Sequence, residues 1–243
     1  MYLSKLILNP RSQSVRRDLA DCQALHRRVL SAFGHVAAED ARAALGVLYR
    51  LETEVRTGAM MLLVQSAERP EWDSLPTQYL LEEDRVENPA CKAIGEKYAV
   101  IEAGMILRFR LRANPTRKIE TKTDANGKKR NGKRVEIRDE EKQLEWLERK
   151  GAQHGFRVRG VRTISENKSV GRHVPQYTTS VAGDSAPLLD DVNNQARLPR
   201  LTFASVLFEG ELLVTNKEMF ADALKHGIGS GKAYGFGLLS ISR

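Results

Sequence analysis

The chain has 243 residues, enough for one large or two small domains, and its 39 Lys and Arg exceed its 31 Asp and Glu by eight. A pI near 9.6 favours an acidic partner, most commonly nucleic acid. No apolar run could span a bilayer, the apolar N-terminus is too short for a signal peptide, and two cysteines form neither a disulfide framework nor a zinc pattern. We therefore expect a cytoplasmic protein with no membrane partner.

The first part of the chain, residues 1–90, has the element order of an α+β unit. The expected elements are a buried strand over 3–8, one helix over about 17–33, two strands over 45–51 and 59–65, and a short helix near 72–75. Asn9-Pro10 ends the first strand, and Gly58 lies in the turn that joins the two later strands as a hairpin. The order β-α-β-β begins a ferredoxin-like βαββαβ unit.

A second unit of the same kind is expected over residues 100–243. Its expected elements are a strand over 105–112, a helix over 139–150, strands over 156–164, 201–208 and 212–215, a helix over 217–225 and a last strand over 236–241. Glu209-Gly210-Glu211 is expected as a turn, and the polar segment 165–198 as a long loop. The fold class is therefore α+β, with two tandem ferredoxin-like domains.

The segment 105–134 carries eleven basic residues opposed only by Glu120 and Asp124. The basic residues are Arg108, Arg110, Arg112, Arg117, Lys118, Lys122, Lys128, Lys129, Arg130, Lys133 and Arg134. The first three alternate with apolar residues, so they share one face of a strand. A solvated strand face with a basic loop is one interpretation. An RNA-binding surface is the other, and the lack of aromatic residues on the basic face favours a duplex or hairpin backbone.

His26 is the candidate for acid–base chemistry, because it lies in a strongly patterned helix with Arg27 and Arg28 directly after it. A histidine titrates near neutrality, and neighbouring cations favour an anionic phosphodiester and its developing charge. A half-buried histidine on a core-facing helix remains the alternative. Cys22 and His26 have the spacing of metal ligands but no further ligand, and Asp190-Asp191 is expected to be solvated.

The end of the chain places five glycines within the eleven residues 227–237, together with Lys232. A magnesium-binding P-loop would have Ser or Thr after the lysine and would open a helix, whereas Ala233 follows here and a helix comes before the loop. A nucleotide hydrolase is therefore disfavoured. A loop that contacts a nucleic-acid backbone, or a helix-capping glycine that leads into a turn, remains open.

Four segments together match the pattern of a known family. They are Leu-Asn-Pro at 8–10, Arg-Arg-Asp-Leu at 16–19 before His26, the segment 107–115 and the ending 227–240. In combination they resemble the CasE family, the CRISPR-associated endoribonucleases of the type I-E Cascade complex, over nearly the full chain.

This resemblance implies two ferredoxin-like domains of the repeat-associated mysterious protein superfamily and cleavage of the CRISPR repeat hairpin without metal or cofactor. It implies that His26 is the acid or base at the scissile phosphate, that the glycine-rich loop 227–237 faces RNA through residues such as Gly229, Gly231 and Lys232, and that the basic segment engages the stem. Arg27 is expected to contact RNA because it directly follows His26. The resemblance also implies that the protein stays bound to the product, as a partner of other Cascade subunits.

Gln23 departs from the family pattern, since some members carry a tyrosine three residues before the histidine. Glutamine can donate or accept a hydrogen bond but cannot usefully give up a proton. Loss of one acid–base partner typically slows a reaction by ~10²–10⁴-fold rather than abolishing it. A non-catalytic, RNA-hairpin-binding Cascade subunit is therefore the alternative function.

Overall fold

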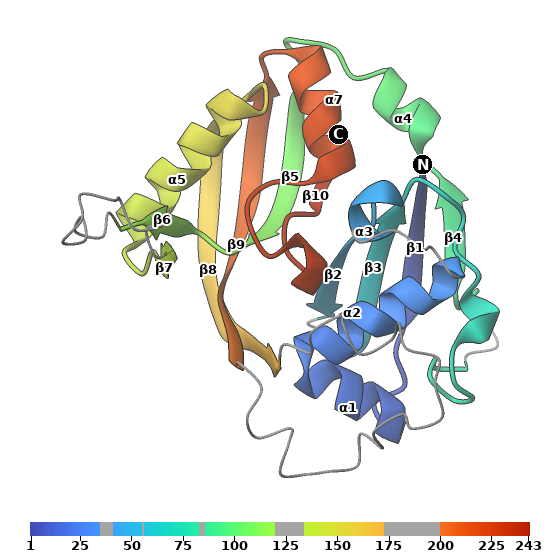
Figure 1. Ribbon diagram of the computed structural model, residues 1–243. Coiled ribbons are helices and arrows are strands. Elements are labelled where there is room, and N and C mark those ends of the chain that lie inside the picture. Colours follow the sequence, from blue (N-terminus) through green and yellow to red (C-terminus); the bar gives the residue numbers. More distant parts are fainter. Residues whose placement is uncertain (35–40, 55, 83–85, 120–133, 173–199) are drawn as a thin grey trace, which may run out of the picture.

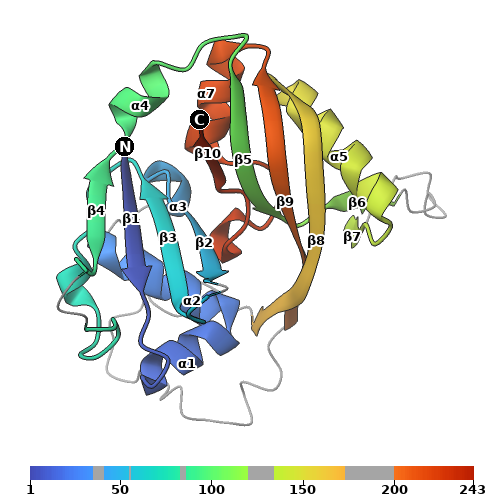
Figure 2. The same cartoon turned by 180° about the vertical axis from the view of Figure 1, so that it is seen from behind.

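The computed structural model describes residues 1–34, 41–54, 56–82, 86–119, 134–172 and 200–243. It contains two four-stranded antiparallel sheets, which lie side by side (Figure 1). The helices α1, α2, α5 and α7 lie on one side of the two sheets. From behind, both sheets present their strands (Figure 2).

The first sheet has the strand order β2-β3-β1-β4. Its strands are β1 Tyr2–Ile7, β2 Leu48–Thr53, β3 Met60–Ser66 and β4 Ala90–Ala93. The order is that of a ferredoxin-like unit, which confirms the predicted fold class. β4 was not predicted, because Ala-Cys-Lys-Ala has neither β-branched residues nor an alternating pattern. The domain boundaries at 90 and 100 stay predictions.

The single helix expected over 17–33 is wrong, because the chain forms two helices. They are α1 Gln13–Ala20 and α2 Cys22–Leu30, followed by the 3₁₀ turn η1 Ser31–Phe33. Asp21 separates them in an extended conformation, and its carboxylate accepts hydrogen bonds from the backbone N–H groups of Gln23 at 2.8 Å and Ala24 at 3.4 Å. This N-cap starts the new helix α2, which carries Gln23 and His26.

Short helical segments complete the first half of the chain. They are α3 Ala41–Ala44, the 3₁₀ turn η2 Trp72–Ser74 and α4 Gly95–Ala99. Apolar residues of α1, α2 and the sheet form one core, in which Val15, Val29 and Leu6 are fully buried. α4 leads from the first sheet to the second (Figure 1).

The second sheet has the strand order β10-β5-β9-β8, which repeats the ferredoxin-like topology. Its strands are β5 Ile106–Ala113, β8 Phe156–Arg172, β9 Arg200–Val214 and β10 Leu239–Ser242, and its helices are α5 Glu140–Gln153 and α7 Lys217–His226. A separate hairpin consists of β6 Thr116–Lys118 and β7 Arg134–Glu136. Asp139 and Asn216 cap the two helices through their side chains.

Two expectations for this sheet are wrong. The predicted turn Glu209-Gly210-Glu211 lies inside the continuous strand β9, where Gly210 is opposite Phe109 and Val161. A Cβ atom at Gly210 would lie 1.9 Å from the carbonyl oxygen of Gly160, so this glycine allows close strand approach at a bulge. The predicted loop 165–198 is also wrong over 165–172, which belong to β8, and its remainder lies outside the described residues.

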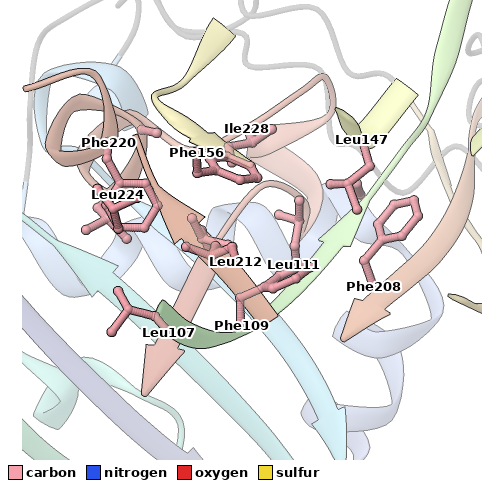
Figure 3. Close-up of a cluster of buried hydrophobic side chains, with 14 of the residues drawn as sticks. Leu107, Phe109, Leu111, Leu147, Phe156, Phe208, Leu212, Phe220, Leu224 and Ile228 are labelled. Carbon is pink, nitrogen blue, oxygen red and sulfur yellow. The ribbon is translucent and has the colours of Figure 1, made fainter. Parts of the chain in front are cut away.

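The core of the second half is built from the alternating residues of β5. Leu107, Phe109 and Leu111 are buried and pack with residues of β9 and α7, including Leu212 and Phe220 (Figure 3). The predicted period-two pattern is therefore confirmed, and the arginines of β5 lie on the opposite face of the strand.

Candidate active site and nucleic-acid interface

His26 lies on α2, which is held against the far end of β8. A Cβ atom at Gly171 would lie 2.6 Å from Sγ of Cys22 and 2.7 Å from Oδ1 of Asp21. The start of α2 therefore rests directly on the backbone of the second sheet. Burial of the Cys22 thiol at this contact raises its pKa to about 11, so it stays neutral.

The side chain of His26 meets Tyr234, which comes from the glycine-rich end of the chain. The two rings make an edge contact with centroids 5.9 Å apart. Tyr234 ends the 3₁₀ turn η4 Lys232–Tyr234, so the contact joins a helix of the first half to a loop of the second. In Figure 1 this loop lies between the two sheets, close to α2.

Tyr234 belongs to an aromatic cluster that the sequence analysis missed. Its ring stacks on Phe203 of β9 at 4.9 Å between centroids, Phe236 lies 5.8 Å from Phe203, and the guanidinium of Arg112 lies 5.3 Å above Phe236. Phe203 and Arg112 are too far from Tyr234 in the sequence for any local pattern to connect them to it. The only available signal was the alternation of Tyr234 and Phe236 with glycines at 235 and 237.

The glycine-rich loop packs tightly on the protein itself. Its five glycines, Gly227, Gly229, Gly231, Gly235 and Gly237, all have positive φ. A Cβ atom at Gly227 would lie 2.8 Å from Leu48, and one at Gly235 would lie 3.2 Å from the ring of Tyr49. Gly227 caps α7, which confirms the capping interpretation for this residue. That Gly229, Gly231 and Lys232 contact RNA stays a prediction.

Three hydrogen bonds hold this loop in place. The N–H of Ile228 donates to the carbonyl of Gly237 at 3.0 Å, and the N–H of Gly237 donates to the carbonyl of Arg112 at 2.8 Å. The hydroxyl of Tyr49 donates to the carbonyl of Ala233 at 2.8 Å. The backbone on both sides of Tyr234 is therefore tied to strands of both sheets.

Lys232 lies near two other cations and one carboxylate. Burial and the nearby cations Arg42 and Lys150 lower the pKa of Lys232, and Asp222 opposes them. Burial also lowers the pKa of His154, as do the charges of Lys150 and of Lys232 itself. Cations that repel one another in this way favour the binding of an anion beside the loop.

The arginines of β5 have different surroundings. Arg108 is exposed, whereas Arg110 pairs with Glu52 of β2 and Glu209 of β9. Arg112 donates to Glu166 and to Ser205, both at 2.7 Å. The sequence pattern correctly put the three on one face, but two of them already have partners in the protein. RNA contacts of all three stay predictions.

Four further predicted contacts are exposed. Arg117 and Lys118 lie on β6, Arg134 lies on β7, and Arg27 lies on α2 beside His26. Four more predicted contacts, Lys128, Lys129, Arg130 and Lys133, fall outside the described residues, as does Asp190-Asp191. The β6–β7 hairpin therefore presents basic side chains from both of its strands.

Gln23 occupies the turn of α2 before His26. Its backbone N–H is used by the Asp21 cap, and its buried side-chain oxygen has no hydrogen-bond partner within the described part of the chain. In the same part of the chain, no three His, Cys, Asp or Glu side chains gather as metal ligands would. None of the described helices is both long and apolar enough to cross a membrane.

The profile of a protein family described as "CRISPR associated protein" matches residues 1–243. The chain is 32% identical to the "CRISPR-associated endoribonuclease Cse3" of Thermus thermophilus, with 100% of both chains covered. It is 29% identical to the "CRISPR system Cascade subunit CasE" of Escherichia coli K12, over 100% of this chain and 99% of that protein.

Similarity extends to three dimensions. The solved structure described as "Structure A of CRISPR endoribonuclease Cse3 bound to 19 nt RNA" has a TM-score of 0.73 to this chain at 31% identity, and 100% of both chains is covered. The overall fold of this chain is thus shared with a protein whose solved structure is described as bound to RNA.

Proposed function

This chain belongs to the CRISPR-associated protein family, among its type I-E CasE-like endoribonucleases, and from that premise we propose that it cleaves the repeat hairpin of precursor CRISPR RNA. The observation that carries the proposal is the contact between His26 of α2 and Tyr234 of the glycine-rich loop. It brings the imidazole of His26, which Arg27 and Arg28 follow in the chain, against the turn that contains Lys232.

The reaction needs no metal ion. The ribose 2′-oxygen attacks the adjacent phosphorus, the 2′-O–P bond forms, and the bond from phosphorus to the 5′-oxygen breaks. One proton leaves the 2′-hydroxyl and one is given to the departing 5′-oxygen, so the products are a 2′,3′-cyclic phosphate and a 5′-hydroxyl. His26 acts as the acid or the base in these proton transfers.

RNA binding is assigned to four exposed cations and to the half-buried Lys232. Arg27 lies beside His26, Lys232 lies in the glycine-rich loop, and Arg117, Lys118 and Arg134 extend from the β6–β7 hairpin toward a stem. Contacts from such residues to phosphate make affinity fall steeply with salt. The double variant Lys118→Ala with Arg134→Ala should therefore weaken binding and reduce the slope of log affinity against log salt by roughly one for each lost contact.

A second function is favoured by Gln23, which cannot transfer a proton as a tyrosine can. In that case the chain holds an already processed hairpin, as a subunit of a Cascade complex, without cutting it. The relative named as a Cascade subunit supports the partnership in either case.

Cleavage in EDTA separates the two functions. The wild-type protein is incubated with its repeat hairpin in EDTA, alongside His26→Ala and the control His226→Ala, which removes an exposed histidine paired with Asp222. We expect cleavage by the wild type and the control, and intact binding without cleavage by His26→Ala. A 2′-deoxy nucleotide directly before the cut should stop the reaction.

Binding without any cleavage by the wild type would establish the non-catalytic alternative. Cleavage of the 2′-deoxy hairpin would exclude attack by the 2′-hydroxyl. Full activity of His26→Ala would move the chemistry to another residue.

A further inference from the structure

We propose that Tyr234 is the positioning residue of this site, and that its aromatic ring orients the imidazole of His26 in a chain whose residue 23 is glutamine. The inference rests on the proposed function and deepens it. It assigns to the glycine-rich loop a role at the histidine, in addition to any contact with RNA.

The helix that carries His26 offers it no aromatic neighbour. Gln23 lies three residues earlier and faces the same side of α2, and its side-chain oxygen is buried without a partner among the described residues. An amide can accept or donate a hydrogen bond, but it cannot make a ring contact. Tyr234, whose ring makes an edge contact with His26, comes from the other half of the chain, 208 positions later.

Tyr234 is itself held from several directions. Phe203 stacks on it, with the two rings 28° from parallel, and its backbone N–H donates to the carbonyl of Gly231 at 2.8 Å. The preceding carbonyl, that of Ala233, accepts from the buried hydroxyl of Tyr49. Gly231 and Gly235 have left-handed conformations on either side of η4. A rigid ring of this kind can hold a neighbouring ring in one orientation.

The ring of Tyr234, rather than its hydroxyl, is the functional part. Burial raises the pKa of Tyr234, so the hydroxyl stays protonated at neutral pH and supplies no base. The edge contact with His26 is an interaction between the two rings, and it does not involve the hydroxyl. Phenylalanine preserves this contact and leucine removes it.

Single-turnover cleavage with protein in excess tests the proposal, using wild type, Tyr234→Phe, Tyr234→Leu and the control Tyr98→Leu. Tyr98 is also half-buried, and its hydroxyl donates to Oε1 of Gln65 at 2.9 Å. Among the described residues it makes no ring contact with Tyr234, Phe203 or Phe236. We expect Tyr234→Leu to lower the cleavage rate constant by roughly 10²-fold, because small displacements of a reacting group have effects of that size. Tyr234→Phe and Tyr98→Leu should cleave at close to the wild-type rate.

Two further measurements separate positioning from loss of structure. Affinity for the uncleavable 2′-deoxy hairpin should be the same for all four proteins. The ring proton and carbon resonances of His26, recorded by NMR without RNA, should move in Tyr234→Leu, where the ring current of Tyr234 is lost, and should keep their wild-type shifts in Tyr98→Leu.

Each result decides one question. Wild-type cleavage by Tyr234→Leu, or an equal loss in Tyr234→Phe and Tyr234→Leu, would overturn the assignment to the ring while leaving the proposed function intact. Absence of wild-type cleavage would refute the proposed function instead. In that case the NMR shifts still decide whether Tyr234 orients His26, and unchanged shifts in Tyr234→Leu would overturn it.

Discussion

Nη1 of Arg50, in the first sheet, donates a hydrogen bond to the carbonyl oxygen of Leu238 at 3.0 Å, beside the first residue of β10 in the second sheet. The same guanidinium donates to the carbonyl of Arg110 at 3.1 Å and to the hydroxyl of Ser240 at 2.9 Å. Its side chain is only 2% exposed and also pairs with Glu52, 14% exposed. One buried arginine therefore joins the two ferredoxin-like units.

Replacement of this arginine should destabilise the whole protein. Arg50→Met leaves two backbone carbonyls and Ser240 without their donor, and loss of one member of a buried ion pair typically costs about 3 kcal/mol or more. Urea unfolding should show that loss. The control Arg162→Met removes an ion pair with Glu209 in which the arginine is 72% exposed, and should cost less than about 1 kcal/mol. Equal losses in the two variants would contradict the role given to Arg50.

The glycine-rich loop should tolerate no side chain at its first position. Gly227→Ala combines a φ of +74° with a Cβ atom 2.8 Å from Leu48, so we expect a loss of about 3 kcal/mol from backbone strain and crowding together. Gly58→Ala is the matched control, because its φ is +70° but no atom of the described residues lies within 4 Å of the added Cβ. Its free energy of unfolding should fall by only about 1 kcal/mol, the cost of the backbone strain without crowding. Similar unfolding free energies for the two variants would rule out the crowding.

Sequence patterns predicted the parts of this structure that depend on local periodicity. The alternation of Leu107, Phe109 and Leu111 identified β5 and its buried face, and the repeated β-α-β-β order identified both units. Sequence patterns gave wrong predictions where the same residue type occurs in two different structural roles. Asp21 was taken as a residue of a continuous helix but acts as a cap, and Gly210 was taken as a turn but permits close contact between strands.

The candidate site could be predicted only in part, for a related reason. The helix of His26 and its arginine neighbours, which are local, made it a candidate, and its role stays a prediction. Tyr234 and Phe203 were missed, because a pair that is distant in the sequence becomes visible only when the strands are placed in space. Charge counting also missed that Arg110 and Arg112 have carboxylate partners, since Glu52 and Glu166 lie far from them along the chain.

The two cysteines should differ in reactivity. Cys22 is buried against Gly171, and with a pKa of about 11 only about one thiol in a thousand is ionised at pH 8. Cys91 is half-buried in the edge strand β4. Iodoacetamide should therefore modify one thiol of the folded protein quickly and the second only after unfolding in urea, and Cys91→Ser should retain only the slow thiol. Equal rates for both thiols would show that α2 does not seal Cys22.

Stability should fall in weak acid through His154. Its pKa is lowered in the folded state, by burial and by Lys150 and Lys232, from an unfolded value near 6.5. Below that pH the unfolded chain takes up the proton first, so the free energy of unfolding decreases as the pH falls toward the folded-state pKa. Urea unfolding at pH 7.5 and 5.5 should show a smaller decrease for His154→Gln than for the wild type. An identical decrease in both would exclude this histidine as a cause.

The contact between Gly171 and the start of α2 has a consequence for exchanging parts among related proteins. The backbone of β8 occupies the space beside Asp21 and Cys22. The helix that bears His26 therefore packs only against a strand that has no side chain at the position of Gly171. A hybrid that takes residues 1–98 from this chain and the remainder from a relative should assemble a working site only if that relative has a glycine opposite Cys22. The helix that bears His26 and the strand that bears Gly171 therefore have to fit each other in any such hybrid.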